Sequence, residues 1–246
     1  MLSYKYKMTI AYDGTGYGGW QVQPNAITIQ SLIERALKII LRSPITVVGS
    51  GRTDAGVHAL GQSAHFASDE PIDVFKTIAS LNGLLPLEIR VLDLIIASPD
   101  FHARYKAISK TYHYRLHLEK IPDPFKQSYA YHVPHPVDLS LLKEAASLLI
   151  GTHDFTSFTN RGSKVKDRIR TLQRLDLIPE PGGVRLEFEG DGFLYKMVRN
   201  IVGTLLDVCA GKLSKEQILP ILAVKDRRVA GRAAPPHGLY LVEVTY

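Results

Sequence analysis

The chain has 246 residues, 45% of them hydrophobic and 22% charged, so it can bury a sizeable core and is not a disordered protein. Thirty Lys and Arg residues against 24 Asp and Glu leave a net charge of +6, which suits a polyanionic partner without proving one. The single cysteine, Cys209, excludes an intrachain disulfide and fits a reducing compartment.

The N-terminus alternates polar and apolar residues over positions 1–8, which predicts a first strand and differs from the continuous apolar run of a signal peptide. No stretch of the sequence reaches the apolar length needed to cross a bilayer, since even residues 84–97 are interrupted by a proline and three charged residues. We therefore expect a cytoplasmic protein with no membrane partner.

In the first half of the chain, apolar residues recur at spacings of three and four after Thr28. This pattern predicts a helix over residues 29–42 that is capped by Thr28 and stopped by Pro44. The other elements expected here are strands at 45–48 and 57–66 joined by a loop at 49–56, a helix from Asp73 to about Gly83, and a strand at 89–97.

Residues 105–118 alternate strictly and predict a long, half-buried strand, with Tyr112 on its apolar face. After a polar, proline-rich stretch, a similar cycle of elements follows. It comprises a helix from Asp138 to Gly151, strands at 168–178 and 184–190 with a hairpin at 181–183, a helix at 192–209, a short helix from Ser214 and a strand at 239–244. Strands and helices mixed in this way, without regular alternation, predict an α+β fold with antiparallel pairing.

Two patterns suggest cofactor or metal sites, and neither is supported by its context. Residues 14–19 satisfy the dinucleotide pattern GxGxxG, but residues 20–24 cannot form the first helical turn that would bind a pyrophosphate. His58 and His65 have an odd separation on one predicted strand, so they face opposite sides. We expect no metal site and no cofactor.

The segment Gly49-Ser-Gly-Arg-Thr-Asp-Ala-Gly-Val-His58 places Asp54 on a glycine-bracketed loop, two residues after Arg52. An adjacent guanidinium favours the ionised carboxylate and orients it through charge-assisted hydrogen bonds, which suits a nucleophile. Taken alone, the same pair is also typical of a structural brace in a tight turn.

The longer string from Gly51 to Ala59, followed by Gly61-Gln62, resembles the catalytic motif of the tRNA pseudouridine synthase A family. Further blocks occur in the order found in that family, so the resemblance spans nearly the whole chain. These blocks are Tyr12-Asp-Gly-Thr15, Gly19-Trp-Gln21, Phe101-His-Ala-Arg104, Lys110-Thr-Tyr-His-Tyr114, Gly192 to Asn200, and Ala234 to Leu239.

The resemblance implies two ferredoxin-like α/β subdomains, residues 1–104 and 105–246, with joined antiparallel sheets and a central cleft. It also implies an isomerase that converts uridines at positions 38, 39 and 40 of the tRNA anticodon stem-loop to pseudouridine, without a cofactor and as a homodimer. The alternative is a catalytically inactive RNA-binding protein of the same fold.

The roles of individual residues follow from the same resemblance. Asp54 is the nucleophile or base that acts at the sugar or the uracil ring, and Arg52 holds the gap left by the flipped base or a phosphate. Tyr112 packs on the base, Arg199 orients Asp54 through an ion pair, and Leu239 forms an apolar floor.

Positive charge is concentrated in two clusters, for which we expect contacts with the RNA phosphate backbone. The first cluster is opposed in the local sequence only by Asp167. The two clusters are Arg161, Lys164, Lys166, Arg168, Arg170 and Arg174, and then Lys225, Arg227, Arg228 and Arg232. A third reading, a phosphate-handling enzyme using Gly49-Ser-Gly51, lacks the lysine and the helix of a P-loop.

Overall fold

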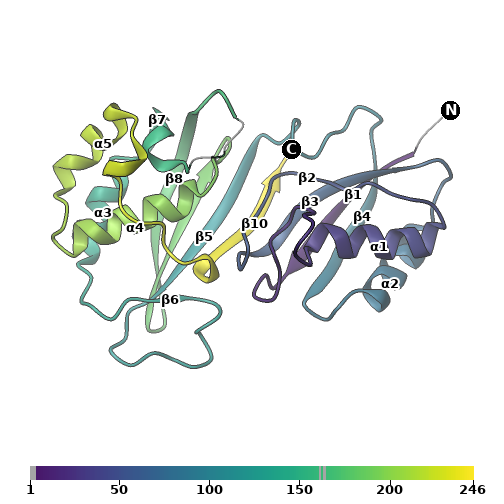
Figure 1. Cartoon of the computed structure of the whole chain (residues 1–246), viewed down its shortest axis with the longest axis horizontal. Coiled ribbons are helices and arrows are strands. Elements are labelled where there is room, and N and C mark those ends of the chain that lie inside the picture. The colour runs from purple at the N-terminus through teal and green to yellow at the C-terminus, as the bar shows by residue number, and fades with distance from the viewer. Residues whose placement is uncertain (1–3, 161, 163–164) are drawn as a thin grey trace. The chain divides into compact units, whose positions relative to one another are not determined.

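The computed structural model describes residues 4–160, 162 and 165–246 and divides into two compact units. Unit 1 consists of Met1–Ile108 and Tyr240–Tyr246, and unit 2 of Ser109–Leu239. In each unit helices pack against a sheet (Figure 1), so the predicted α+β class is confirmed. No helix among the described residues is long and apolar enough to span a membrane.

Unit 1 has strands in the order β4–β1–β3, and both β2 and β10 pair with β3. Its elements are β1 (Tyr4–Tyr12), α1 (Ile29–Leu41), β2 (Val48–Gly49), β3 (His58–Ser68), α2 (Val74–Leu84), β4 (Ile89–Ala97) and β10 (Leu239–Thr245). Strands β1 to β4 pair antiparallel, and this order with two crossover helices is ferredoxin-like. The pairing of β10 with β3 is parallel, unlike the antiparallel pairing predicted.

Helix α1 confirms the prediction made from Thr28 and the apolar spacing. The Thr28 hydroxyl accepts from the Ser31 backbone N–H, and the Ser31 hydroxyl accepts from the Thr28 backbone N–H, which closes a capping box. Ile33 and Leu37 are fully buried, and on β1 the side chains of Tyr6, Met8, Ile10 and Tyr12 alternate inward. The helix ends where Arg42 takes a left-handed conformation, shortly before Pro44.

Unit 2 has a sheet in the order β5–β9–β8–β7, with β6 paired to β5. Its elements are β5 (Ser109–His117), β6 (Tyr131–His132), α3 (Leu139–Ser147), β7 (Gly151–Asp154), β8 (Ile169–Glu180), β9 (Gly183–Gly190), α4 (Met197–Cys209) and α5 (Ile218–Val224). Short 3-10 turns cover Phe155–Phe158, Lys215–Gln217, Arg227–Val229 and Pro236–Gly238. Helices α3 and α4 lie side by side (Figure 1).

Three predicted boundaries differ from the structure. The strand predicted at 105–118 begins at Ser109, because residues before it turn back and hydrogen-bond to His102. The helix predicted from Gly192 begins only at Met197, since Lys196 has φ +60° and cannot continue a helix backwards. The strand predicted at 45–48 is reduced to Val48–Gly49, and the short strands β6 and β7 were not predicted.

His65 on β3 holds the segment after β4 in place. Its Nδ1 accepts from the Ala103 backbone N–H at 3.1 Å. Burial, with the nearby charges of His102 and Lys5, lowers the pKa of His65 to about 4. The folded protein therefore keeps this imidazole neutral under conditions in which the unfolded chain protonates it.

We expect the free energy of unfolding to fall as the pH drops from about 6.5 to about 4, because the unfolded state then binds a proton that the folded state does not. The contribution of His65 is at most about 3 kcal/mol. Urea unfolding of the wild type and of His65→Gln at several pH values measures it. The variant should show the shallower pH dependence, and parallel curves would contradict the assignment.

Candidate catalytic site

Asp54 lies on a tight turn between β2 and β3 and is partly exposed. The Val57 backbone N–H donates to the Asp54 carbonyl at 3.1 Å, and Gly56 in the third position of this turn has φ +77°. A positive φ at that position is the signature of a type II turn, which glycine adopts without strain. The turn therefore presents the Asp54 side chain from a backbone of fixed geometry.

Thr53 anchors the turn on the side that precedes Asp54. Its hydroxyl is 2.8 Å from the Tyr12 hydroxyl, and its carbonyl accepts from the Trp20 backbone N–H at 3.1 Å. Burial raises the pKa of Tyr12 to about 12, so this phenol stays protonated and serves as a structural partner. The turn is thus bonded both to β1 and to the loop before α1.

Gln62 on β3 fixes the preceding residues of the loop. Its side chain is fully buried, its Oε1 accepts from the Ser50 hydroxyl at 2.8 Å, and its Nε2 donates to the Gly51 carbonyl at 3.1 Å. Sequence analysis gave Gln62 no role, although a glutamine in the middle of a predicted strand was a signal for a buried polar contact.

Arg52 does not form the ion pair with Asp54 that the sequence predicts. Its side chain is exposed, and its Nε donates to Gln21 Oε1 at 3.2 Å. Gln21 in turn donates to Gln30 at 2.7 Å, and the buried Gln30 donates to the Val47 carbonyl at 2.9 Å. These amides set the direction of Arg52, a role that sequence analysis did not assign to Gln30.

The loop that follows β1 supports the Asp54 turn. The Asp13 carboxylate accepts from the Thr15 backbone N–H and hydroxyl, so its side chain caps this turn. His58, buried at the start of β3, has its Nδ1 3.1 Å from both the Gly14 backbone N–H and the Asp13 carboxylate. No helix begins directly after Gly19, since the next helix, α1, starts only at Ile29. The GxGxxG pattern of residues 14–19 is therefore not a dinucleotide site.

In unit 2, Tyr112 lies on the buried face of β5 and is 7% exposed. Its ring meets that of Phe193 edge to face, with centroids 4.9 Å apart. Phe193 belongs to the loop between β9 and α4. The loop that leads into the helix of Arg199 therefore packs on Tyr112. The predicted orientation of Tyr112 toward the buried face is confirmed.

Arg199 lies in the first turn of α4. Its Nε donates to the Ala234 carbonyl at 2.7 Å, and the Ala234 backbone N–H donates to the Arg199 carbonyl at 2.9 Å. Its charge is close enough to Tyr114 to oppose the rise that burial causes in the pKa of that phenol. Leu239, at the start of β10, is buried.

The first basic cluster is only partly available for RNA. Arg161 and Lys164 lie outside the described residues. Arg174 is already paired with carboxylates, at 2.6 Å from Glu187 and 3.2 Å from Glu189. Asp167 is the only opposing charge in the local sequence, but these two carboxylates come from the neighbouring strand β9. Lys166 remains exposed, and Arg168 and Arg170 are half-buried.

The second basic cluster is engaged with the protein to a similar extent. Lys225 pairs with Asp154 at 2.8 Å, and Arg228 pairs with Asp226 at 2.5 Å. Arg227 is half-buried and hydrogen-bonded to neutral oxygens of the protein, and Arg232 is exposed. Within the two clusters, Lys166 and Arg232 are the exposed cations without an ion pair among the described residues.

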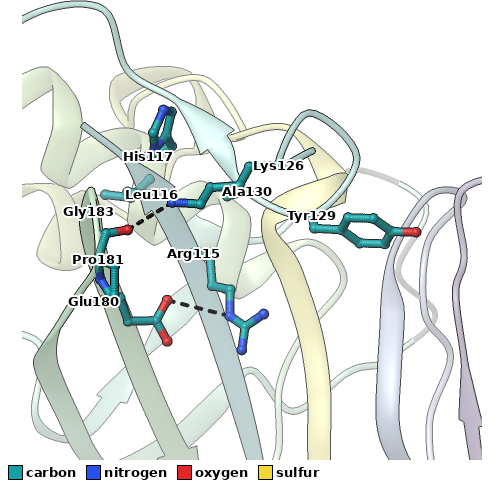
Figure 2. A pocket seen from close by; sticks show the side chains of 9 residues that line it. All are labelled: Arg115, Leu116, His117, Lys126, Tyr129, Ala130, Glu180, Pro181 and Gly183. Atoms are coloured by element: carbon teal, nitrogen blue, oxygen red, sulfur yellow. Dashed lines mark hydrogen bonds and ion pairs between the residues drawn. The ribbon is translucent and has the colours of Figure 1, made fainter. Parts of the chain in front are cut away.

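A pocket of about 310 Å³ lies in unit 2, between the loop after β5 and the β8–β9 hairpin (Figure 2). Arg115 faces Glu180 at 3.6 Å, and Lys126 donates to the Pro181 carbonyl at 2.9 Å. None of the predicted site residues lines this pocket. Its cations already face oxygen atoms of the protein, so we do not assign the candidate site to it.

The described residues contain no group of three histidine, cysteine, aspartate or glutamate side chains placed to hold a metal ion. Cys209 is half-buried and donates weakly to the Asp138 carbonyl at 3.7 Å. Burial and the nearby Asp138 raise the pKa of this thiol to about 11, so it is not a thiolate nucleophile.

Comparison with known proteins identifies the family of this chain. The family model described as tRNA pseudouridine synthase matches residues 8–106 and 145–246. The chain is 57% identical over 245 residues to tRNA pseudouridine synthase A 1 of Protochlamydia amoebophila, covering 98% of this chain and 96% of that protein.

Two further relatives match a similar share of this chain. The tRNA pseudouridine synthase A of Bacillus subtilis is 47% identical, with 98% of this chain and 99% of that protein covered. The tRNA pseudouridine synthase A of Chlamydia muridarum is 47% identical, with 98% and 92% covered. The chain therefore belongs to the tRNA pseudouridine synthase family.

Proposed function

We propose that this chain isomerises uridine to pseudouridine in tRNA, at positions 38, 39 and 40 of the anticodon stem-loop. The observation that carries the proposal is the match to tRNA pseudouridine synthases over nearly the whole chain, together with an Asp54 turn held by bonds from β1 and β3. The three positions rest on the family resemblance of the sequence.

The reaction is balanced without a cofactor. The bond between ribose C1′ and uracil N1 breaks, the base rotates, and a bond between C1′ and C5 forms. The proton on C5 leaves and N1 gains one, so neither oxidant nor energy source is consumed. The uridine must first leave its stack, at a cost of roughly a few kcal/mol.

In this proposal Asp54 attacks C1′ or the uracil ring, or acts as a base. Its turn suits any of these roles, because the backbone is fixed on both sides of the acid. Arg52, directed by Gln21, holds a phosphate or the gap left by the flipped base. An exposed guanidinium whose Nε is held by an amide keeps its other N–H groups free to bind an anionic ligand.

Tyr112 and Arg199 complete the proposed machinery. Tyr112 packs on the flipped base and assists removal of the C5 proton, and Arg199 orients Asp54. The hydrogen bond from Arg199 Nε to the Ala234 carbonyl supports the role of Arg199, because it fixes the plane of the guanidinium. Leu239 supplies the apolar floor.

We also propose that the protein acts as a homodimer in the cytoplasm. The family resemblance supports the dimer, and the single cysteine is compatible with a reducing compartment. Light scattering on the purified protein measures the oligomeric state.

Incubation of the purified protein with unmodified tRNA, followed by digestion to nucleosides, should yield pseudouridine without any added cofactor. Transcripts with cytidine at positions 38, 39 and 40 should yield none. Pseudouridine formed equally in the cytidine transcripts would overturn the assigned positions. Tight tRNA binding with no pseudouridine at all would favour the inactive RNA-binding alternative.

A further inference from the structure

Residues 226–235, which we call the strap, follow α5 and run along helix α4 within unit 2 (Figure 1). The Gly231 backbone N–H donates to the Thr204 hydroxyl at 2.9 Å. A Cβ atom on Gly203 would lie 1.6 Å from the Arg232 carbonyl oxygen, so the two backbones touch there. The strap therefore packs on α4 through direct backbone contact.

The end of the strap holds Arg199. Ala234 donates to the Arg199 carbonyl and accepts from Arg199 Nε, at 2.9 and 2.7 Å. One residue later, the Pro235 carbonyl accepts from the Tyr114 hydroxyl at 2.8 Å. A shift of the strap at Ala234 would therefore rotate the guanidinium of Arg199.

The beginning of the strap is held by Arg227. Its Nη2 donates to Asn200 Oδ1 at 2.8 Å, its Nη1 to the Ala230 carbonyl at 3.0 Å, and its Nε to Asn160 Oδ1 at 3.3 Å. These acceptors lie on α4, on the strap itself and in the loop after β7. One guanidinium thus joins three segments.

Asn200, the residue after Arg199, is the centre of this connection. Its side chain is fully buried, and its Nδ2 donates to the Phe158 carbonyl at 2.7 Å and to Asn160 Oδ1 at 3.0 Å. With Arg227 bound to its Oδ1, both polar atoms of the amide are satisfied. A buried amide in this state has one preferred orientation, which it imposes on its partners.

The charge of Arg227 is unusual for its surroundings. Burial lowers the pKa of this guanidinium, and its hydrogen-bond acceptors among the described residues are neutral amide and carbonyl oxygens. Burying a cation against neutral acceptors costs free energy, which the geometry of five fixed donors offsets. The neighbouring Arg228 is exposed and paired with Asp226, so the two arginines have different roles.

We propose that Arg227 and Asn200 are positioning residues, which fix the strap so that Ala234 holds Arg199 in its working orientation. The proposal rests on the proposed function for the meaning of that orientation. It assigns Arg227 an internal task in place of the phosphate contact expected from its position in a basic cluster.

Arg227→Lys and Arg227→Gln, compared with the wild type, test this proposal. Both variants should lower kcat by about 10- to 100-fold while the Kd for tRNA changes less than about threefold, because a lysine cannot donate to three separated acceptors. Lys143→Gln, which removes an exposed charge on α3, is the control and should leave kcat and Kd unchanged. A phosphate contact would give the opposite result, in which Lys retains affinity and Gln weakens it and lowers the salt slope by about 1.

Amide hydrogen exchange gives a readout that does not depend on activity. In Arg227→Gln, the amides of Gly231 and Ala234 should exchange at least about 10-fold faster, while those of β9 keep their rates. Unchanged exchange at both amides would overturn the positioning role even if kcat falls. If the wild type forms no pseudouridine, the proposed function fails, and the exchange result still decides whether Arg227 fixes the strap.

Discussion

Asp54→Asn should abolish pseudouridine formation and leave tRNA affinity nearly intact. The substitution preserves the size of the side chain and the backbone of its turn, and it removes the charge that attacks the substrate or takes its proton. Loss of a nucleophile or base lowers kcat by roughly 10⁴-fold or more in other enzymes. Affinity should change little, because removing a negative charge does not weaken contacts with phosphates.

Single-turnover assays with enzyme in excess measure the chemical step, and filter binding measures the Kd for tRNA. Asp69→Asn is a matched control, since Asp69 is exposed just after β3 and its loss should leave both quantities unchanged. Turnover retained in Asp54→Asn would contradict the role of Asp54. Weakened binding with the chemical step unchanged would instead make Asp54 a binding residue.

Gly19→Ala should disrupt the same turn from its supporting side. Gly19 has φ +87°, and a Cβ atom there would lie 2.5 Å from the Thr53 carbonyl oxygen and 2.9 Å from the Asp54 carbonyl carbon. Both are backbone atoms that cannot rotate away. We expect the free energy of unfolding to fall by about 2–4 kcal/mol. Displacement of Asp54 by about 1 Å should lower kcat roughly 100-fold in the protein that remains folded.

Gly16→Ala is the matched control for this experiment. Gly16 lies in the same loop, and a Cβ atom there would meet nothing within 4 Å. Its unfolding free energy should stay within about 0.5 kcal/mol of the wild type. Urea unfolding and single-turnover assays well below the melting temperature compare the two variants. Equal stability of both, or full kcat in Gly19→Ala, would show that Gly19 does not support the turn.

The local elements were predictable wherever one segment contains its own signal. Thr28 followed by apolar residues at helical spacing gave α1 with its cap, and the alternation around Tyr112 gave the buried face of β5. The start of α4 was missed, because a lysine gives no sequence signal for the left-handed conformation that Lys196 adopts.

Contacts between residues that lie far apart in the chain could not be predicted from the sequence. Arg174 was assigned to RNA because its carboxylate partners, Glu187 and Glu189, face it only after β8 and β9 pair. Arg52 donates to Gln21 and not to Asp54, although Asp54 is only two residues away in the sequence. The fold brings the Gln21 amide, which is itself bonded to Gln30 of α1, next to Arg52. Charge counted along a sequence cannot show such pairing.

The sequence by itself determined the family, the α+β class and the position of Asp54 on a tight loop, because motif, periodicity and turn chemistry are carried by neighbouring residues. Only the tertiary structure decided which polar groups hold that loop and which arginines remain available for a substrate. The physical reason is that buried donors and charges must find partners, and a fold supplies those partners from distant segments such as Gln62 for Ser50 and Asn200 for Arg227.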